Sequence, residues 1–407
     1  MEQTKRLRFV LTRREGLDSP DGVNIFIVAL AQALLELGHD VSIVVGSLGS
    51  EEEFQRLLAP RIHLAIHALS RTPLSGVASV TAWLRAKSAI DRFGPNLIVH
   101  NEAVPLPFHA PTAQVVHDLQ PRNGPLAPIW RTIRRFSTRR SSHVIATTSE
   151  LRDALERDLK MSASEIAVIP KCVDLQAYRG ADLAGRERAI LHSGTLPYKD
   201  PGATIRAFGE LDDSTVALYI VGDVTEPTRE TVDVLPERLR RRVVLLGQTD
   251  AATLRALLGR VRVAAFPTHY AVPVASGTVM EAIAAGAPIV GSSQISHDVL
   301  ADGVNGIVAD PKSGVMAAAL SDVLNDDGLW LRLSGGARRM ASAFDAVRVA
   351  RRYVELASPN GSSETRRSSG LDRPAKGRKD GRAAFRPFQS IAQRRGGCLV
   401  WGARRCA

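Results

Sequence analysis

The chain alternates short apolar runs with amphipathic stretches, and it does so twice. Two early runs, residues 7–11 and 41–45, are apolar on both faces, as buried parallel strands are. Between them, apolar residues recur at helical spacing over residues 25–37 and stop at Gly38. The remaining strands predicted in this half are residues 96–100, 113–116, 143–147 and 166–169. Strands that alternate with helices predict a doubly wound α/β architecture.

The pattern loosens over residues 175–188 and then restarts, which predicts two α/β domains in tandem. A chain of 407 residues is too long for one ordinary core, so two domains are expected. We predict domains at residues 1–174 and 189–343, a hinge between them and a closing helix over residues 344–357. The strands predicted in the second domain are residues 189–192, 217–221, 243–245, 263–266, 288–290 and 306–309.

The net charge of +11 is concentrated at the end of the chain. Residues 358–407 hold 12 Lys and Arg against three Asp and Glu, whereas the remainder carries a net charge of only +2. This tail is rich in Ser, Gly, Pro and Arg with little apolar periodicity, so disorder is predicted. It is interpreted as a solvated tail, a tether to an anionic surface or a non-native terminus. No recognition-helix, RNP-like or zinc signature favours nucleic acid as a partner.

The three cysteines, at positions 172, 398 and 406, match neither a disulfide framework nor a zinc spacing. No metal-ligand cluster is evident in the sequence, and no apolar stretch reaches the roughly 20 residues that span a bilayer. The first residues hold too short an apolar run for a signal peptide. These features together predict a soluble cytoplasmic protein.

Residues 274–290 (VASGTVMEAIAAGAPIV) form a nearly all-apolar helix that keeps one acid, Glu281. The small residues Ser276, Gly277 and Thr278 precede it, and amides at a helix N-terminus suit a phosphate. A carboxylate one turn into the helix could accept hydrogen bonds from two adjacent hydroxyls, such as those of a ribose. Alternatively, Glu281 serves only to complement the helix dipole.

A second segment, residues 122–143, holds six arginines and no acid. Its apolar residues recur at helical spacing: Ile129, Trp130, Ile133 and Phe136. A basic amphipathic helix with an aromatic residue suits an anionic membrane surface, at which the protein would be peripheral. The alternative is a basic solvated face over an apolar stripe that packs inside the protein.

Residues 266–311 (FPTHYAVPVASGTVMEAIAAGAPIVGSSQISHDVLADGVNGIVADP) resemble the donor-site segment of the large retaining glycosyltransferase family 4, whose fold is GT-B. Three further segments agree in the family's order, and the similarity covers about residues 6–357. They are residues 21–45 with the first helix, residues 168–178 (VIPKCVDLQAY), and residues 192–208 (HSGTLPYKDPGATIRAF) followed by ALYIVGD. The resemblance implies two Rossmann-like domains that face each other across a cleft.

The resemblance also implies roles for individual residues. Glu281 is expected to bind the ribose of a nucleotide-sugar, and Lys199 to contact its diphosphate as a point charge. His117, in the segment VVHDL, is expected near the transferred sugar. The first loop and the helix that carries Glu281 are expected to approach the phosphates through Gly22, Ser276, Gly277 and Thr278.

The reaction that the family carries out is transfer of a sugar from a nucleoside-diphosphate-sugar to a hydroxyl acceptor, with retention. The acceptor would be a glycan, a lipid-linked molecule or a small molecule, and neither a metal nor a further cofactor is expected. Stabilisation of the departing diphosphate should be the main catalytic effect. No paired carboxylates in a hydrolase-like context appear, which disfavours a glycosidase.

The sequence departs from the family pattern at four positions. Pro273 stands where the family usually has a second glutamate, and Thr195 stands where an arginine is common. Lys171 and Cys172 replace an Asn-Gly pair, and Lys171 could supply part of the missing positive charge. These departures leave open a catalytically inactive GT-B protein that binds a nucleotide or a glycan. A sugar-nucleotide epimerase is disfavoured, because the acid and base residues of that class are not evident.

Overall fold

The computed structural model describes residues 5–17, 22–47, 65–70, 76–104, 106–119, 127–178, 185–211 and 213–358. They belong to one compact unit, Met1–Ser369, and the other unit, Gly370–Ala407, lies outside the described residues. The predicted tail therefore cannot be compared with the structure beyond Ser358, nor can the middle of the predicted hinge, residues 179–184.

The first half of the chain forms a seven-stranded sheet in which every neighbouring pair is parallel. Its order is β3-β2-β1-β4-β5-β6-β7, so the direction of winding reverses between β1 and β4. The strands are β1 (Arg8–Gly16), β2 (Asp40–Ser47), β3 (Ala65–Ala68), β4 (Leu97–His100), β5 (Thr112–Val116), β6 (His143–Ala146) and β7 (Ile166–Val168).

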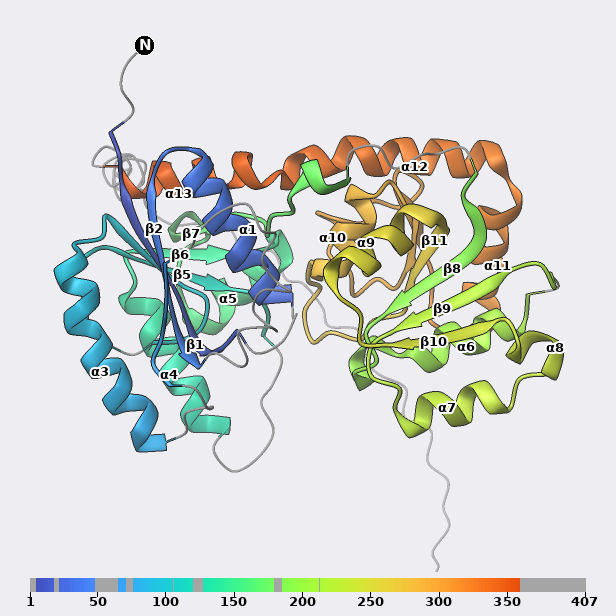
Figure 1. Cartoon of the computed structure of the whole chain (residues 1–407), viewed down its shortest axis with the longest axis horizontal. Coiled ribbons are helices and arrows are strands. Elements are labelled where there is room, and N and C mark those ends of the chain that lie inside the picture. Colours follow the sequence, from blue (N-terminus) through green and yellow to red (C-terminus); the bar gives the residue numbers. More distant parts are fainter. Residues whose placement is uncertain are drawn as a thin grey trace, which may run out of the picture. The chain divides into compact units, whose positions relative to one another are not determined.

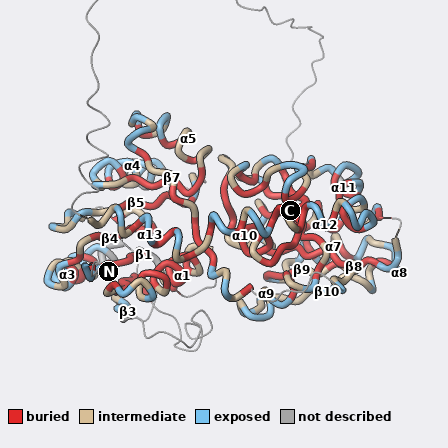
Figure 2. The backbone as a smooth tube through the Cα atoms, turned by 90° about the horizontal axis from the view of Figure 1, so that it is seen from above, coloured by how far each residue is buried: buried red, intermediate tan, exposed pale blue. Residues whose placement is uncertain are grey.

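Helices cover both faces of this sheet, because its central strands are apolar on both sides. α1 (Gly22–Glu36) packs on one face, and α3 (Gly76–Phe93) packs on the other around Trp83. α4 (Ala127–Arg140) and α5 (Ser149–Leu159) are the other helices among the described residues of this half. The backbone is buried along the strands and α1 (Figure 2). α1 ends two residues before Gly38, whose φ of 85° lies in the left-handed region that suits glycine.

The second half forms a six-stranded parallel sheet in the order β10-β9-β8-β11-β12-β13. Here the winding reverses between β8 and β11. The strands are β8 (Glu187–Ser193), β9 (Ala217–Val221), β10 (Val243–Gly247), β11 (Val261–Phe266), β12 (Ile289–Gly291) and β13 (Gly306–Val308). The helices are α6 (Pro201–Gly209), α7 (Glu226–Asp233), α8 (Glu237–Arg240), α9 (Ala251–Arg260), α10 (Gly277–Ala284), α11 (Ser313–Asn325) and α12 (Asp327–Ala341).

The last described helix, α13 (Ala346–Ala357), packs against α1 and not against the second sheet (Figure 1). Ala346, Val349, Ala350 and Tyr353 belong to the same apolar cluster as α1. The predicted closing helix thus exists, although it begins at Ala346 because residues Ser342–Phe344 form a short 3-10 turn.

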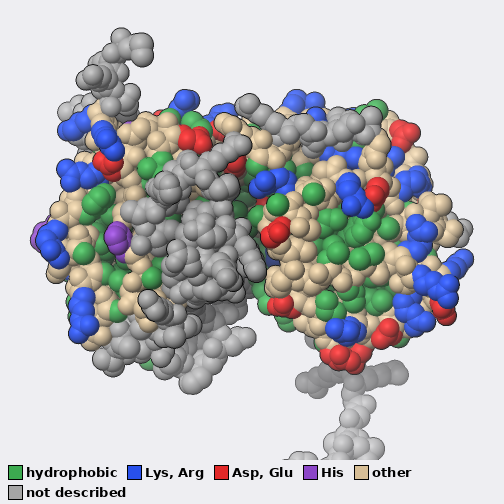
Figure 3. All heavy atoms as spheres, viewed as in Figure 1, with side chains coloured by type: hydrophobic (Ala, Val, Ile, Leu, Met, Phe, Trp, Pro, Cys, Tyr) green, Lys and Arg blue, Asp and Glu red, His purple; other side chains and the backbone are tan. Residues whose placement is uncertain are grey.

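The sequence prediction missed one strand, the edge strand β3, and placed most strand ends within two or three residues. The exception is β1, which runs to Gly16 through Arg13 and other polar residues that the apolar pattern does not include. No helix in the described part of the chain is long and apolar enough to cross a membrane. On the face drawn in Figure 3, Lys and Arg side chains are interspersed with Asp and Glu over the second half.

Candidate functional site

The predicted site residues follow strands next to the two points where the winding reverses. His117 comes directly after β5, and Lys199 follows β8. Ser276 precedes α10, after the loop that leaves β11. Ligands of open parallel sheets bind outside the carboxyl ends of strands at such points. The topology therefore puts each of these residues at the edge of a sheet that suits ligand binding.

Lys199 ends the 3-10 turn Pro197–Lys199 and is buried, with 8% of its surface exposed. Its Nζ donates a hydrogen bond to Ser276 Oγ at 2.9 Å. The ammonium also lies over the rings of Tyr198 and Tyr270, 5.7 and 5.4 Å from their centroids. Burial and the positive charge of Lys171 lower the pKa of Lys199 to about 7. Binding of an anion next to this buried lysine would stabilise its charged form.

The N-terminus of α10 lies beside this ammonium. Ser276 is its N-cap residue, but its side chain does not cap the helix and instead accepts a hydrogen bond from Lys199. Gly277 approaches Gly22 at the start of α1 so closely that a Cβ on Gly277 would lie 3.2 Å from Gly22 Cα. Two helix N-termini and a lysine therefore converge, and each favours negative charge. Thr278, the next residue of α10, is half-buried.

Glu281 is the fifth residue of α10, so it lies beyond the first turn of the helix. The dipole effect fades within that turn, which disfavours the alternative that Glu281 only complements the dipole. The side chain is buried, and Tyr178 donates its hydroxyl to Oε1 at 2.9 Å. Burial raises the pKa of Glu281, and Tyr178 and the charge of Arg255 partly oppose that rise. Oε2 has no hydrogen-bond partner among the described residues and remains able to accept.

His117 is a neutral imidazole with a defined tautomer. Asn101 donates its Nδ2 to Thr12 O at 3.2 Å, which turns its Oδ1 towards His117 Nε2 at 3.0 Å. Nε2 therefore carries the proton. Nδ1 is buried without a hydrogen-bond partner in the described part of the chain. Burial and the charges of Lys171 and Arg13 hold the pKa of His117 well below its usual range.

Two further cations act on His117 and Lys199. Lys171 and Arg13 are both buried, each with 7% of its surface exposed. Lys171 lowers the pKa of both His117 and Lys199, so its charge acts on residues from both halves of the chain. Positive charge is therefore present although Thr195 stands where the family often has arginine.

The position of the missing glutamate has a structural role. Pro273 O accepts a hydrogen bond from Thr148 Oγ1 at 3.3 Å, and Thr148 also caps α5. The sequence departure therefore lies in a loop of the second half that contacts the first half. The structure gives no carboxylate at this position to replace the glutamate.

One side-chain group in the described part of the chain has the composition of a metal site, although the sequence suggested none. Oxygen and nitrogen atoms of Glu150, His297 and Asp298 lie within 4.8 Å of one another. These atoms already have partners. Glu150 accepts from His297 N at 2.8 Å, and Asp298 accepts from Ser149 N at 2.6 Å. The group caps the start of α5, where the positive helix end disfavours a cation.

Sequence reasoning missed two residues that hold the predicted ones. Asn101 follows β4 directly, so the same rule that selected His117 after β5 could have selected it. Tyr178 lies in the segment 168–178, but a tyrosine after a strand carries no signal for a contact with Glu281, 103 residues later.

Comparisons with known proteins agree with this arrangement. Residues 20–177 match the family described as Glycosyltransferase Family 4, and residues 187–326 match the family described as Glycosyl transferases group 1. The phosphatidyl-myo-inositol mannosyltransferase of Mycolicibacterium smegmatis is 29% identical over 346 residues, which cover 77% of this chain and 84% of that protein. The D-inositol 3-phosphate glycosyltransferase of Streptomyces avermitilis is 26% identical over 382 residues, 81% of each chain.

The fold also matches solved structures. Anabaena HepE in complex with UDP and glucose superposes with a TM-score of 0.66 at 19% identity, covering 87% of this chain and all of that one. The two parallel sheets are those of the two-domain, Rossmann-like GT-B fold. The family matches, the relatives and the fold together assign the chain a glycosyltransferase activity, and they disfavour the catalytically inactive alternative. The chain belongs to the GT-B glycosyltransferases of family 4, the group 1 glycosyl transferases.

Proposed function

We propose that this enzyme transfers a sugar from a nucleoside-diphosphate-sugar to a hydroxyl of a phosphorylated inositol or a similar phosphorylated polyol. The observation that carries the donor half of the proposal is the contact of Lys199 with Ser276 at the start of α10, one turn before Glu281. The acceptor class rests on the two relatives, whose names both specify an inositol that carries a phosphate. Lipid-linked and small-molecule acceptors are both represented in that pair.

The diphosphate of the donor binds between Lys199 and the N-terminus of α10. Backbone amides that Ser276 does not cap face an anion there, and the glycine pair Gly22 and Gly277 allows close approach of the backbone. Lys171 adds a second buried ammonium. Because these charges stand in place before the reaction, they stabilise the leaving diphosphate with little reorganisation.

The ribose of the donor binds Glu281. Tyr178 already donates a hydrogen bond to Oε1. The ribose hydroxyls therefore donate their hydrogen bonds mainly to Oε2 and to the second lone pair of Oε1. The buried carboxylate is costly as a charge, and two hydroxyl donors offset part of that cost.

His117 holds a hydroxyl of the transferred sugar. A neutral imidazole whose Nε2 is committed to Asn101 presents Nδ1 as an acceptor, which matches a hydroxyl donor. Its low pKa argues against a role as a general acid. We infer retention of the anomeric configuration from the family, whose members are retaining. Neither a metal nor a further cofactor is part of the proposal.

We further propose that α4 brings the enzyme to the anionic inner face of a membrane from the cytoplasm. Ile129 and Phe136 are about half exposed, and Ile133 is partly buried, so part of the apolar side of α4 faces the surface. Five arginines accompany them on the helix: Arg131, Arg134, Arg135, Arg139 and Arg140. Arg134 and Arg135 contact Asp158 on α5, which leaves the others as the main contributors.

Product analysis tests the proposed reaction. The full chain is incubated with UDP-, GDP-, ADP- and TDP-sugars, each with inositol 3-phosphate or with unphosphorylated inositol, and the product is examined by NMR. We expect release of nucleoside diphosphate with one donor, dependence on the acceptor phosphate, and an unchanged anomeric configuration. Equal turnover with unphosphorylated inositol would contradict the acceptor class, and an inverted product would contradict retention.

Vesicle co-sedimentation tests the membrane proposal separately. Ile129→Ser and Phe136→Ser should release the protein from vesicles that contain phosphatidylglycerol, whereas Leu331→Ser, at an exposed position on α12, should not. Equal binding to neutral phosphatidylcholine vesicles would exclude an electrostatic contribution from the arginines.

A further inference from the structure

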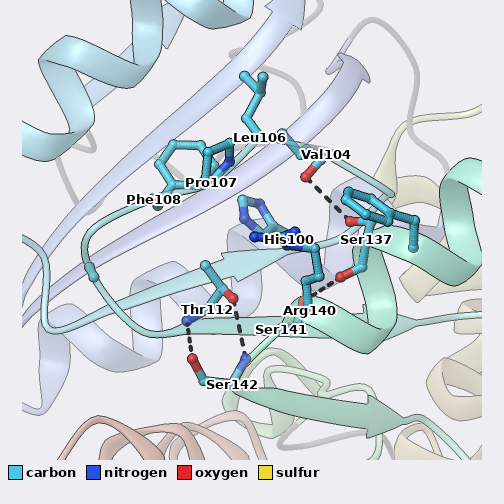
Figure 4. Close-up of a pocket in the computed structure, with 12 residues that line it drawn as sticks. His100, Val104, Leu106, Pro107, Phe108, Thr112, Ser137, Arg140, Ser141 and Ser142 are labelled. Atoms are coloured by element: carbon cyan, nitrogen blue, oxygen red, sulfur yellow. Dashed lines mark hydrogen bonds between the residues drawn. The ribbon is translucent and has the colours of Figure 1, made fainter.

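A cavity of about 270 Å³ lies between β4, β5 and the end of α4, in the first half of the chain. Figure 4 shows His100 between the segment Leu106–Phe108 and the α4 residues Ser137 and Arg140. The cavity is separate from the proposed donor site, since His117, Lys199 and Glu281 do not line it. By comparison with a 150 Å³ cavity that binds benzene, it has room for on the order of ten non-hydrogen atoms.

One end of the cavity is lined by hydrogen-bond donors. Thr112 Oγ1 accepts from Ser142 N at 3.4 Å, and Ser142 Oγ accepts from Thr112 N at 3.2 Å. Each hydroxyl uses a lone pair in this exchange and keeps its own proton available for a ligand. Both residues and their hydrogen bonds are drawn in Figure 4.

Arg140 stands at the same end. Its guanidinium lies 5.1 Å from the centroid of the Phe136 ring, and it has no acidic partner among the residues that the structure describes. Among the described residues that line the cavity, none is an aspartate or a glutamate. Two hydroxyl donors and a guanidinium without a neighbouring acid favour an anion.

Most of the other wall is apolar and surrounds His100. Val104, Leu106, Pro107 and Phe108 line this part of the cavity. Ser137 and Ser141 also line the cavity, and their hydroxyls donate to the backbone oxygens of Val104 and Ser137. His100 is 2% exposed and its Nδ1 contacts Thr12 Oγ1 at 2.7 Å, while its Nε2 has no hydrogen-bond partner in the described part of the chain. Burial lowers the pKa of His100 to about 4, so the ring is neutral and contributes a hydrogen bond without a charge.

We propose that this cavity binds an amphiphilic organic anion. Arg140, Thr112 and Ser142 hold its phosphate or carboxylate group, and the apolar body lies against Leu106, Phe108 and their neighbours, with His100 Nε2 available for one polar atom. The shared chemistry is that of an alkyl phosphate, which could be a free metabolite or a lipid headgroup with the start of its chain. This inference goes beyond the proposed sugar transfer and does not depend on it.

Calorimetric titration of hexyl phosphate into the full chain tests the proposal, because this probe has the size and both chemical parts of the expected ligand. Inorganic phosphate and hexanol serve as controls for the two parts. We expect hexyl phosphate to bind at least about tenfold more tightly than hexanol, because hexanol lacks the anion that makes charge-assisted hydrogen bonds. We expect the same margin over inorganic phosphate, because inorganic phosphate lacks the chain that buries apolar surface. Binding of hexanol with the same affinity, or no binding of hexyl phosphate, would overturn the proposal.

A pair of variants locates the binding. Arg140→Gln should weaken hexyl phosphate about tenfold, whereas Arg139→Gln, the same charge change at the neighbouring exposed residue outside the cavity, should not. Ser142→Ala should weaken binding to a smaller degree. Both arginines are exposed, so neither change threatens the fold, and circular dichroism checks this. Equal weakening by the two arginine variants would indicate attraction to the helix surface and would overturn the cavity assignment.

Competition distinguishes the two sources of the ligand. Vesicles that contain phosphatidic acid, a lipid phosphate monoester, are added to the protein with bound hexyl phosphate. Displacement of hexyl phosphate from the wild-type chain by these vesicles, but not by phosphatidylcholine vesicles, supports a lipid headgroup as the ligand. Retention of hexyl phosphate in the presence of phosphatidic acid supports a free molecule. Equal displacement by both kinds of vesicle would contradict recognition of a phosphate in the cavity.

Discussion

The environment of Lys199 makes its charged form unfavourable unless an anion binds nearby. It is buried next to a second buried lysine, Lys171, and its pKa falls to about 7. An ordinary structural lysine would instead be solvated or paired with an acid. Strongly shifted groups of this kind cluster at functional sites, and this supports Lys199 as the diphosphate ligand.

The pH dependence of stability should reveal this lysine. Between pH 7 and about 10.5, Lys199 binds a proton in the unfolded chain but not in the native one, so raising the pH favours the native state. We expect the free energy of unfolding to rise over this window by at most about 1.4 kcal/mol per pH unit relative to Lys199→Met. Urea denaturation from pH 6 to pH 10 measures the difference. Parallel pH profiles for the two proteins would contradict the shifted pKa, and Lys312→Met, at an exposed position, is the control.

Substitution of Glu281 should change the affinity for the donor nucleotide without lowering the stability of the protein. Glu281→Gln keeps an acceptor for Tyr178 but removes a buried charge, so the denaturation midpoint should not fall. Affinity for the nucleoside diphosphate should fall about 10- to 100-fold, because hydrogen bonds to a charged acceptor contribute roughly 1.5–3 kcal/mol. Calorimetry measures the affinity, with the exposed Glu237→Gln as the control. A lower midpoint with unchanged affinity would make Glu281 a structural residue.

The candidate ligand-binding residues were easier to predict from the sequence than the residues that hydrogen-bond to them and hold them in place. Glu281, Lys199 and His117 were found because they stand in recognisable motifs after strands. Asn101 and Tyr178 were not, since their roles depend on contacts between segments that are distant in the sequence. The tautomer of His117 also follows only from the three-dimensional contact with Asn101.

At the scale of elements, the approach of α1 to α10 depends on two glycines. A Cβ on Gly277 would lie 3.2 Å from Gly22 Cα, which is backbone and cannot rotate away. Gly277→Ala should therefore push the two helix N-termini apart and raise the KM for the donor at least about tenfold. Steady-state kinetics measure this. Gly335→Ala, on α12, is the matched control, because its Cβ would meet only the flexible end of Arg339 at 3.4 Å. An unchanged KM in Gly277→Ala would contradict a role for this approach.

The start of α5 joins the two halves through reciprocal hydrogen bonds. Glu150 accepts from Ser296 Oγ at 2.6 Å and from His297 N at 2.8 Å, while Asp298 accepts from Ser149 N at 2.6 Å. Glu150→Ala should lower the free energy of unfolding by about 1–3 kcal/mol, because it leaves these donors without a charged partner.

Urea denaturation tests this contact against Glu156→Ala, an exposed glutamate on the same helix that should change stability by less than about 0.5 kcal/mol. The same loss of stability in both variants would mean that Glu150 stabilises the protein only as a negative charge on α5 and not through its hydrogen bonds.

Most elements were predictable because apolar periodicity reports burial directly. The central strands are apolar on both faces, and their ends were placed closely. β3, by contrast, is a short edge strand, AIHA, whose apolar run is too short to distinguish it from a loop. The reciprocal contacts of α5 could not be predicted, since serine, glutamate and histidine at these positions also suit an exposed surface.

At the scale of the whole molecule, the chain passes between the two halves twice at one place. Val173 N donates to Phe344 O at 2.9 Å, and Ala346 N donates to Val173 O at 3.1 Å. The first crossing therefore pairs with the segment that leads into α13, which then packs on α1. The sequence predicted a last helix but not its packing partner, because an amphipathic pattern shows that a face is buried without showing where.

If the donor nucleotide binds at Lys199 and the start of α10, its affinity depends on the ammonium of Lys199. UDP, GDP, ADP and TDP are titrated into the wild-type chain, into Lys199→Met and into the exposed control Lys312→Met. We expect one nucleotide to bind the wild type and Lys312→Met equally, and to bind Lys199→Met at least about tenfold more weakly. Equal affinity of all three proteins for that nucleotide would contradict this binding site.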